Sequence, residues 1–137
     1  MKNFKNIFFL PSILIMFFLI QNLAYGDQSI EGVWKGSAWG DFLKIEFKNN
    51  KKCNIEVHNK SGEILVLKGT YELDFNKKPI PLSIRNVSNL NHPLHTIIRF
   101  VDDDTVEMMK FSYSQRFRPI FFSDEKKIRL KRNKIDN

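Results

Sequence analysis

Apolar and polar residues alternate along residues 65–75, which form the most regular stretch of the sequence. One phase holds Leu65, Leu67, Tyr71, Leu73 and Phe75, and the other holds Lys68, Thr70, Glu72 and Asp74. A period of two predicts a long β-strand with one buried face and one face in water. Gly69 falls in the apolar phase, which indicates a bulge or a close approach of a second backbone.

The rest of the chain supplies shorter segments of the same kind, separated by turns. Strands are expected near residues 29–36, 42–48, 53–57, 80–85, 96–101, 105–111 and 126–132, with a turn at 40–41 and a loop at 86–93. No segment shows an apolar stripe of helical period over three turns. About eight short strands with short connections are typical of an up-and-down antiparallel barrel or a sandwich. We predict an all-β fold, a single antiparallel meander barrel, because closure removes exposed strand edges.

The first 26 residues have the pattern of a secretory signal peptide. Lys2 and Lys5 precede an apolar run at 7–20, and Ala24-Tyr25-Gly26 offers small residues for cleavage. The apolar run is broken by Pro11 and is short for a spanning helix, so an uncleaved membrane anchor is the less favoured alternative. We expect a signal-peptide helix at 1–26 and an exported domain at 27–137, periplasmic or secreted, with no membrane span after cleavage.

Charge and cysteine content limit the possible functions. The chain carries a formal charge of +7, of which Lys2 and Lys5 would leave with the signal peptide. Lysine pairs beside turns are usually solvated, and no aromatic residues alternate with them as nucleic-acid stacking requires, so no specific nucleic-acid binding is expected. Cys53 is the only cysteine, which excludes an internal disulfide, and its phase with Ile55 and Val57 predicts a buried, unreactive thiol.

Two short patterns resemble known proteins. Gly32-x-Trp34 at the start of a meander resembles the opening of lipocalin-like (calycin) barrels. The resemblance implies that the tryptophan plugs the closed end and stacks on a basic side chain of the last strand, either Arg129 or Arg132. The alternation of Ile128 and Leu130 would point Arg129 outward.

The second resemblance spans most of residues 30–122. Gly69-x-Tyr71-x-Leu73-Asp74, Pro79, an Ile-Arg-Phe run reaching Asp104, and Arg118-Pro119-x-x-Phe122 occur in this order in small exported bacterial domains of uncharacterised, lipocalin-like type. That family has no established activity, so the resemblance implies none for this chain. Gly32, Trp34, Gly69, Arg118, Pro119 and Arg129 are the structural residues that the two resemblances select.

The sequence offers little catalytic or metal-binding chemistry. His58, His92 and His95 lack the additional ligands that a metal or haem site needs. Asp102-Asp103-Asp104 is better explained as a hairpin turn than as a cation site, because calcium loops space their ligands at alternate positions. No paired carboxylates in an apolar setting, Gly-x-Ser-x-Gly elbow or phosphate-binding glycine loop is present. We therefore predict neither an enzyme nor a cofactor.

Two functional hypotheses remain. In the first, the barrel binds a small or apolar ligand in its mouth, covered by the loop at 86–93, and its aromatic candidates are Trp34, Tyr71, Phe100, Phe121 and Phe122. In the second, aromatic residues fill the interior and the protein is an interaction module of the cell envelope, such as an inhibitor of a secreted enzyme. The segment Arg118–Phe122 either seals the mouth, presents an adhesive patch, or packs as part of a long loop.

Overall fold

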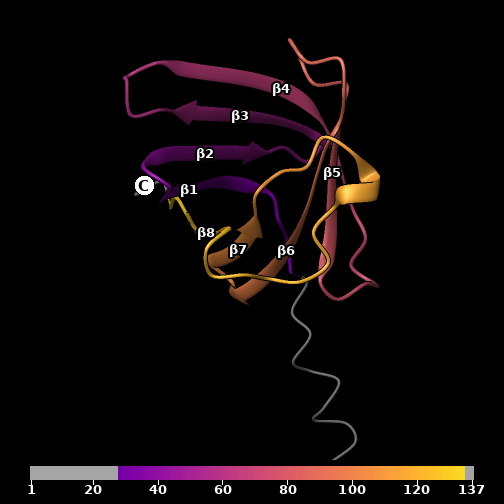
Figure 1. Ribbon diagram of the computed structural model, residues 1–137. Coiled ribbons are helices and arrows are strands. Elements are labelled where there is room, and N and C mark those ends of the chain that lie inside the picture. Colours follow the sequence, from indigo (N-terminus) through magenta and orange to yellow (C-terminus); the bar gives the residue numbers. More distant parts are fainter. Residues whose placement is uncertain (1–27, 135–137) are drawn as a thin grey trace, which may run out of the picture.

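Eight antiparallel strands form one closed barrel in which each strand pairs with the next and β8 pairs with β1 (Figure 1). The structure, a computed structural model, describes residues 28–134. The elements are β1 (Gly32–Ala38), β2 (Asp41–Phe47), β3 (Lys52–His58), β4 (Ile64–Leu73), β5 (Ile80–Arg85), β6 (Leu94–Asp102), β7 (Thr105–Met109), the single-turn 3-10 helix η1 (Gln115–Phe117) and β8 (Lys127–Arg132). The predicted meander barrel is confirmed, whereas the predicted signal peptide lies outside the described residues.

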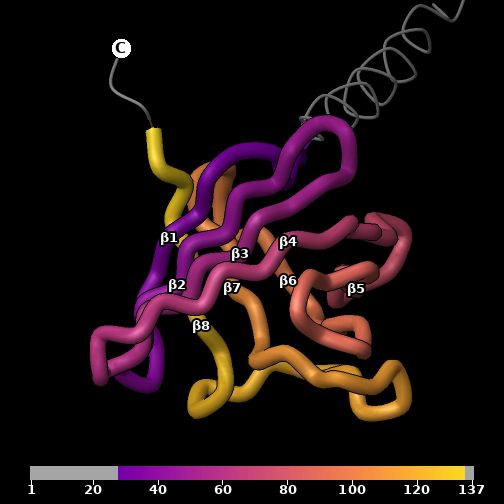
Figure 2. The backbone as a smooth tube through the Cα atoms, turned by 90° about the horizontal axis from the view of Figure 1, so that it is seen from above, coloured from indigo at the N-terminus to yellow at the C-terminus, as the bar shows by residue number. Residues whose placement is uncertain are grey.

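The strand register places the alternating apolar residues inside the barrel. Trp34, Ile45, Ile55 and Leu67 lie opposite one another on β1 to β4, and all four are buried. These four strands follow one another side by side in Figure 2. The eight strands and the core of the part that the structure describes lie between residues 30 and 132, so this range closes a barrel around its own core.

The long strand predicted at 65–75 ends earlier than its alternation suggested. β4 stops at Leu73, and the Asp74 carboxylate accepts a hydrogen bond of 3.0 Å from the Asn76 backbone N–H, which starts the turn. Phe75 therefore lies past the strand, where its ring stacks on Phe100 with the centroids 6.4 Å apart. Asp74 is therefore a turn residue and not part of the strand.

The connections divide the barrel into two ends. The turns β2–β3, β4–β5 and β6–β7 lie with residues 28–31 at one end, which we call the closed end, and the remaining connections lie at the open end. At the open end the β1–β2 turn consists of Trp39 and Gly40, not Gly40 and Asp41 as predicted. Both residues have positive φ, +56° and +83°, which is the type I′ conformation favoured in two-residue hairpins.

Residues 110–126, which we call the strap, run outside the barrel between β7 and β8. In Figure 1 the strap crosses from β7 towards β5 and returns. Ser112 forms an isolated bridge with His95 on β6, and Arg118 reaches Ser83 on β5. The strap explains why the first half of β6 is buried on both faces, because the inner residues face the core while the outward His95 and Ile97 lie beside the strap.

Gly69 shows the close approach that the pattern predicted. A Cβ at this position would lie 2.7 Å from Ile84 Cγ2 and 2.9 Å from the Arg85 carbonyl oxygen. Both neighbours belong to β5, which pairs with β4 directly after this position. Only glycine leaves enough room for this contact.

We expect Gly69→Ala to lower the free energy of unfolding by about 1–3 kcal/mol, because the added methyl group overpacks the contact with β5. The measurement is urea unfolding followed by circular dichroism. Lys68→Ala, on the exposed face of the same strand, is the control and should stay close to the unmodified protein. An unchanged midpoint for Gly69→Ala would show that β5 relaxes without cost.

Candidate functional site

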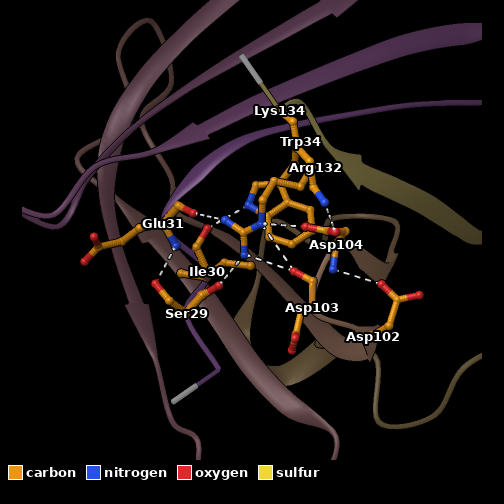
Figure 3. A network of polar contacts seen from close by, with 9 residues as sticks. All are labelled: Ser29, Ile30, Glu31, Trp34, Asp102, Asp103, Asp104, Arg132 and Lys134. Atoms are coloured by element: carbon orange, nitrogen blue, oxygen red, sulfur yellow. Dashed lines mark hydrogen bonds and ion pairs between the residues drawn. The ribbon is translucent and has the colours of Figure 1, made fainter. Parts of the chain in front are cut away.

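Trp34 plugs the barrel towards its closed end. The side chain has no exposed surface, and its indole N–H donates a hydrogen bond of 2.7 Å to the Ile30 carbonyl oxygen (Figure 3). Its ring meets Phe100 edge-on, with the centroids 6.3 Å apart. The N–H is thus satisfied within the protein, and the ring is surrounded by core atoms.

Arg132, the last residue of β8, stacks on one face of the Trp34 ring. Its guanidinium carbon lies 4.2 Å from the ring centroid. The same guanidinium donates hydrogen bonds to the backbone carbonyl oxygens of Ser29, at 2.8 Å, Asp103, at 3.2 Å, and Glu31. One side chain therefore joins the first residues of the domain, the β6–β7 turn and the last strand (Figure 3).

Two further features belong to this arrangement. Gly32 has φ of +117°, and a Cβ there would lie 2.9 Å from Arg132 Nη1, so a larger residue would be strained and would crowd the guanidinium. The Asp104 carboxylate lies 3.6 Å from Arg132 Nε and 2.6 Å from Lys134 Nζ. The aspartate triplet is a turn, as predicted, and it also receives the arginine.

Of the two arginines proposed to stack on Trp34, the structure selects Arg132. Arg129 points outward, and its guanidinium lies 2.8 Å from the Glu107 carboxylate on the outer wall. Trp34 and Arg132 are directly opposite in the β1–β8 pairing. Trp34 and Arg132 form a structural plug at the closed end, in which the indole N–H and the guanidinium donate to backbone carbonyl oxygens.

The open end contains an apolar cavity of about 330 Å³. Its walls are inward residues of the strands together with residues of the β1–β2 turn, the 86–93 loop and the strap: Ala38, Trp39, Asp41, Leu43, Ile55, Val57, Leu65, Leu67, Leu90, Leu94, Met108, Met109, Lys110, Phe111, Tyr113 and Ile128. The volume is at the lower end of the range for small-molecule pockets, and the lining is largely hydrophobic.

Leu65 and Trp39 mark the rim of this cavity. Leu65 belongs to the inward phase of β4, yet 50% of its surface is exposed at the edge of the cavity. The indole N–H of Trp39 donates a hydrogen bond of 2.7 Å to the Glu125 carbonyl oxygen, which fixes the β1–β2 turn to the strap. An apolar guest could cover Leu65 without displacing any part of the core.

The five aromatic residues predicted to bind ligand lie away from this cavity. Trp34, Tyr71 and Phe100 pack in or near the closed end, where the Tyr71 hydroxyl donates to the Lys48 carbonyl oxygen at 2.8 Å. Phe121 and Phe122 belong to the strap on the outer wall, and none of the five lines the open-end cavity. The loop at 86–93 contributes Leu90 to the cavity.

A buried polar cluster fastens the strap to the outer wall. Arg118 Nη2 donates to Ser83 Oγ at 2.6 Å and to His95 Nδ1 at 3.1 Å, and the two acceptors face each other across β5 and β6. Burial, together with the Arg118 charge, lowers the pKa of His95, so the ring is neutral and Nδ1 accepts. Pro119 is the next residue of the strap. The sequence resemblance selected Arg118 and Pro119, and in the structure Arg118 anchors the strap to β5 and β6.

A groove of about 680 Å³ separates the strap from the β4–β5 hairpin. Its lining mixes cations, carboxylates and apolar groups: Glu72, Leu73, Asp74, Lys77, Lys78, Pro79, Pro81, Ser83, Arg85, Ile97, Gln115, Arg118, Pro119 and Ile120. Glu72 pairs with Arg85 at 3.2 Å, and Asp74 pairs with Lys77 at 3.5 Å. This groove is larger than the open-end cavity, but its lining is mixed in polarity and it lies outside the barrel.

Glu107 on β7 is the only acidic residue buried among residues 28–134. Its carboxylate contacts the guanidinium groups of Arg99 and Arg129 and, at 3.3 Å, the Lys127 ammonium. Hydrogen bonds from these cations, that of Arg129 first, lower the pKa of Glu107 from 4.5 to about 2. Arg99 also lies 4.3 Å from the centre of the Phe122 ring, so the cluster holds the returning half of the strap.

The other predicted chemical groups are dispersed. His58 contacts the Glu56 carboxylate at 2.6 Å, and His92 packs on Tyr113 with the ring centroids 4.4 Å apart. Cys53 is buried as predicted, and burial raises the pKa of its thiol to about 11. Between residues 28 and 134, no group of three His, Cys, Asp or Glu side chains is placed to hold a metal ion. No helix in the same range is long and apolar enough to cross a bilayer.

Sequence reasoning missed the residues that form the mouth. Trp39 lies in a two-residue turn and has a positive φ. The only indication of this turn in the sequence is the Gly40 that follows. Leu65 was recognised as inward-facing, but its exposure depends on the absence of a cover, which is a property of the assembled barrel.

Comparison of the chain with protein-family models, curated proteins and solved structures gave no significant match.

The closed-end plug predicts that Arg132→Lys is costly although the charge is kept. Lysine lacks the planar fork that reaches several carbonyl oxygens while stacking on the indole. Since a charged hydrogen bond contributes about 1.5–3 kcal/mol and a cation–π contact about 1 kcal/mol, we expect a loss of about 2–4 kcal/mol in unfolding free energy. Chemical denaturation measures it. Lys131→Ala, on the adjacent exposed position, should change little; an equal effect of both would contradict the assignment.

The Glu107 cluster predicts a specific acid sensitivity. The folded-state pKa is lowered, so the carboxylate stabilises the fold above the unfolded pKa of 4.5, and this contribution is lost as the pH falls towards 2. At most about 3 kcal/mol is involved. Unfolding free energies of the protein and of Glu107→Gln, measured near pH 6 and near pH 3, should differ more at the higher pH. A difference independent of pH would contradict a charged Glu107.

Proposed function

We propose that this protein is a lipocalin-like barrel that binds a small apolar ligand in its open-end cavity. The observation that carries the proposal is the contrast between the two ends, since one is plugged by Trp34 and Arg132 and the other leaves an apolar space of about 330 Å³. The Gly32-x-Trp34 start with a stacked arginine from the last strand supports the lipocalin-like relationship. Export of the domain remains part of the proposal.

The lining of the cavity indicates the chemistry of the ligand. Most of the wall is aliphatic, with two methionines whose flexible side chains adapt to different shapes. Asp41 and Lys110 are the charged residues of the lining, and the Lys110 ammonium lies 5.9 Å from the centre of the Trp39 ring at the rim. A ligand with an apolar body inside and a polar end at the rim fits this distribution. The alternative of an interaction module with a solid core is less well supported, because the interior is filled only towards the closed end.

The protein carries its own reporter for this site. Trp34 is fully buried at the closed end, whereas Trp39 lies on the rim and is 46% exposed. A ligand that covers the mouth should therefore change the fluorescence of Trp39 and leave that of Trp34 almost constant. Trp39→Phe separates the two signals.

We expect the folded protein to take up a fluorescent apolar probe, and Leu65→Glu to weaken the uptake at least about tenfold because it places a charge in the apolar mouth. Val66→Glu is the matched control, since Val66 is the next residue on β4, is similarly exposed and points to the outer face. Probe titrations followed by probe emission and by Trp39 emission give both affinities. Equal affinity of the two variants, or no uptake by the unmodified protein, would refute the proposal.

A further inference from the structure

The strap exposes large apolar side chains to an unusual degree. Tyr113, Phe117, Ile120 and Phe121 stand within nine residues of one another, and each is 66–76% exposed. Aromatic residues of this size are mostly buried in proteins, and a run of them on one surface segment marks a site of interaction. A surface partner would bury what the fold leaves in water.

The strap is held firmly although its apolar side chains point outward. Ser112 and His95 exchange two backbone hydrogen bonds of 2.7 and 2.8 Å, and Arg118 reaches buried acceptors on β5 and β6. The Glu125 carbonyl oxygen accepts the Trp39 indole N–H. The exposed side chains are therefore presented on a fixed frame, and little conformational entropy would be lost when they bind.

The strap segment that carries these side chains has basic charges only. Between residues 108 and 123 the chain has no acidic residue, while it carries Lys110, Arg116 and Arg118. Across the outer groove lies Lys78, which lines the same groove as Ile120. Neither Arg116 nor Lys78 forms an ion pair with any residue between 28 and 134. The groove also holds Glu72 and Asp74, but these carboxylates are paired with Arg85 and Lys77. Exposed apolar groups of the strap thus lie next to basic groups that have no ion-pair partner among the described residues.

We propose that this surface, made of Phe117, Ile120, Phe121, Arg116 and Lys78 and called here the docking surface, binds to anionic lipid bilayers. A bilayer interface accommodates both kinds of group at once, because aromatic and aliphatic side chains enter the boundary of the acyl chains while cations meet the anionic headgroups. An acidic protein would pair with the cations, but it would cover the apolar side chains only if it also carried a matching hydrophobic patch. The inference does not depend on the open-end cavity, since none of the five residues lines it.

The experiment is vesicle co-sedimentation of residues 27–137, which contain the complete barrel. Cooperative unfolding by circular dichroism first verifies that each variant is folded. Vesicles of phosphatidylcholine alone are compared with an equal mixture of phosphatidylcholine and phosphatidylglycerol. We expect binding to the mixed vesicles, much weaker binding to the neutral ones, and a decline as the salt concentration rises.

Two sets of variants separate the apolar and the electrostatic contributions. Phe117→Ser/Ile120→Ser/Phe121→Ser should lower the partition coefficient roughly tenfold or more, while Val66→Ser/Val101→Ser, at half-exposed positions elsewhere, should not. Arg116→Gln/Lys78→Gln should lower it about fivefold for each cation near the surface. Lys52→Gln/Lys68→Gln removes the same charge from the outer wall of β3 and β4 and is the matched control.

Three results would overturn the proposal. The first is failure of the unmodified domain to bind mixed vesicles. The second is equal loss of binding in the docking-surface variants and their controls, which would reduce the effect to net charge or general apolarity. The third is a dimer in analytical ultracentrifugation that the triple serine variant converts to a monomer, because the surface would then be covered by a second copy. Uptake of the apolar probe by the same samples reports on the cavity separately.

Discussion

The stack of Arg132 on Trp34 is the interaction on which the closed barrel depends. Only Trp34–Arg132 and Lys35–Lys131 pair across the seam between β1 and β8, so the ladder at this point is short. The arginine strengthens it from inside, because its guanidinium also holds the backbone of residues 29 and 31 and the β6–β7 turn. These side-chain contacts add to the backbone hydrogen bonds at the closed end, where the Asn133 N–H donates to the Val33 carbonyl oxygen and the Arg132 N–H to the Asp104 carbonyl oxygen. The positive φ of Gly32 is the backbone conformation that makes room for this side chain.

Placing a plug at one end gives the barrel a direction. Trp34, Phe47 and Tyr71 fill the interior towards the closed end, and the Phe47 and Tyr71 rings pack edge-on with centroids 4.9 Å apart. Towards the open end the inward strand residues that line the cavity are mainly aliphatic, and the aromatic residues of its lining, Trp39, Phe111 and Tyr113, come from the β1–β2 turn and the strap. The open end therefore keeps an apolar space, whereas the closed end is filled by large rings. A ligand in the cavity at that end would leave the contacts of Trp34 and Arg132 unchanged.

The sequence was sufficient for the parts of the fold that follow from local periodicity. Alternation along each strand identified the barrel, the buried thiol of Cys53 and the close approach at Gly69, and it could also have selected Arg132. Ile128 and Leu130 point inward, so the next residue in the same phase is Arg132 and not Arg129. The strap could not be predicted in this way, because it has no regular period and its positions are set by contacts distant in sequence, such as Arg118 with Ser83 and Trp39 with Glu125. The mouth depends on the same contacts, which is why Trp39 and Leu65 were not recognised as its rim.

The strap also accounts for the burial of outward residues on β6. His95 and Ile97 are buried on the outside of the barrel, and the strap covers this part of the strand with a polar cluster at each side, Ser83–His95–Arg118 and Glu107–Arg99–Arg129. These clusters fix the backbone of the strap, so that the side chains needed for covering, such as Phe122 beneath Arg99, turn inward. Along an extended segment the neighbouring side chains then have to turn outward, as Phe121 does. Covering β6 accounts for Phe122, but it requires no large apolar residue at the outward positions, where serine or lysine would serve equally well. The aromatic residues at those positions therefore need an explanation outside the barrel itself.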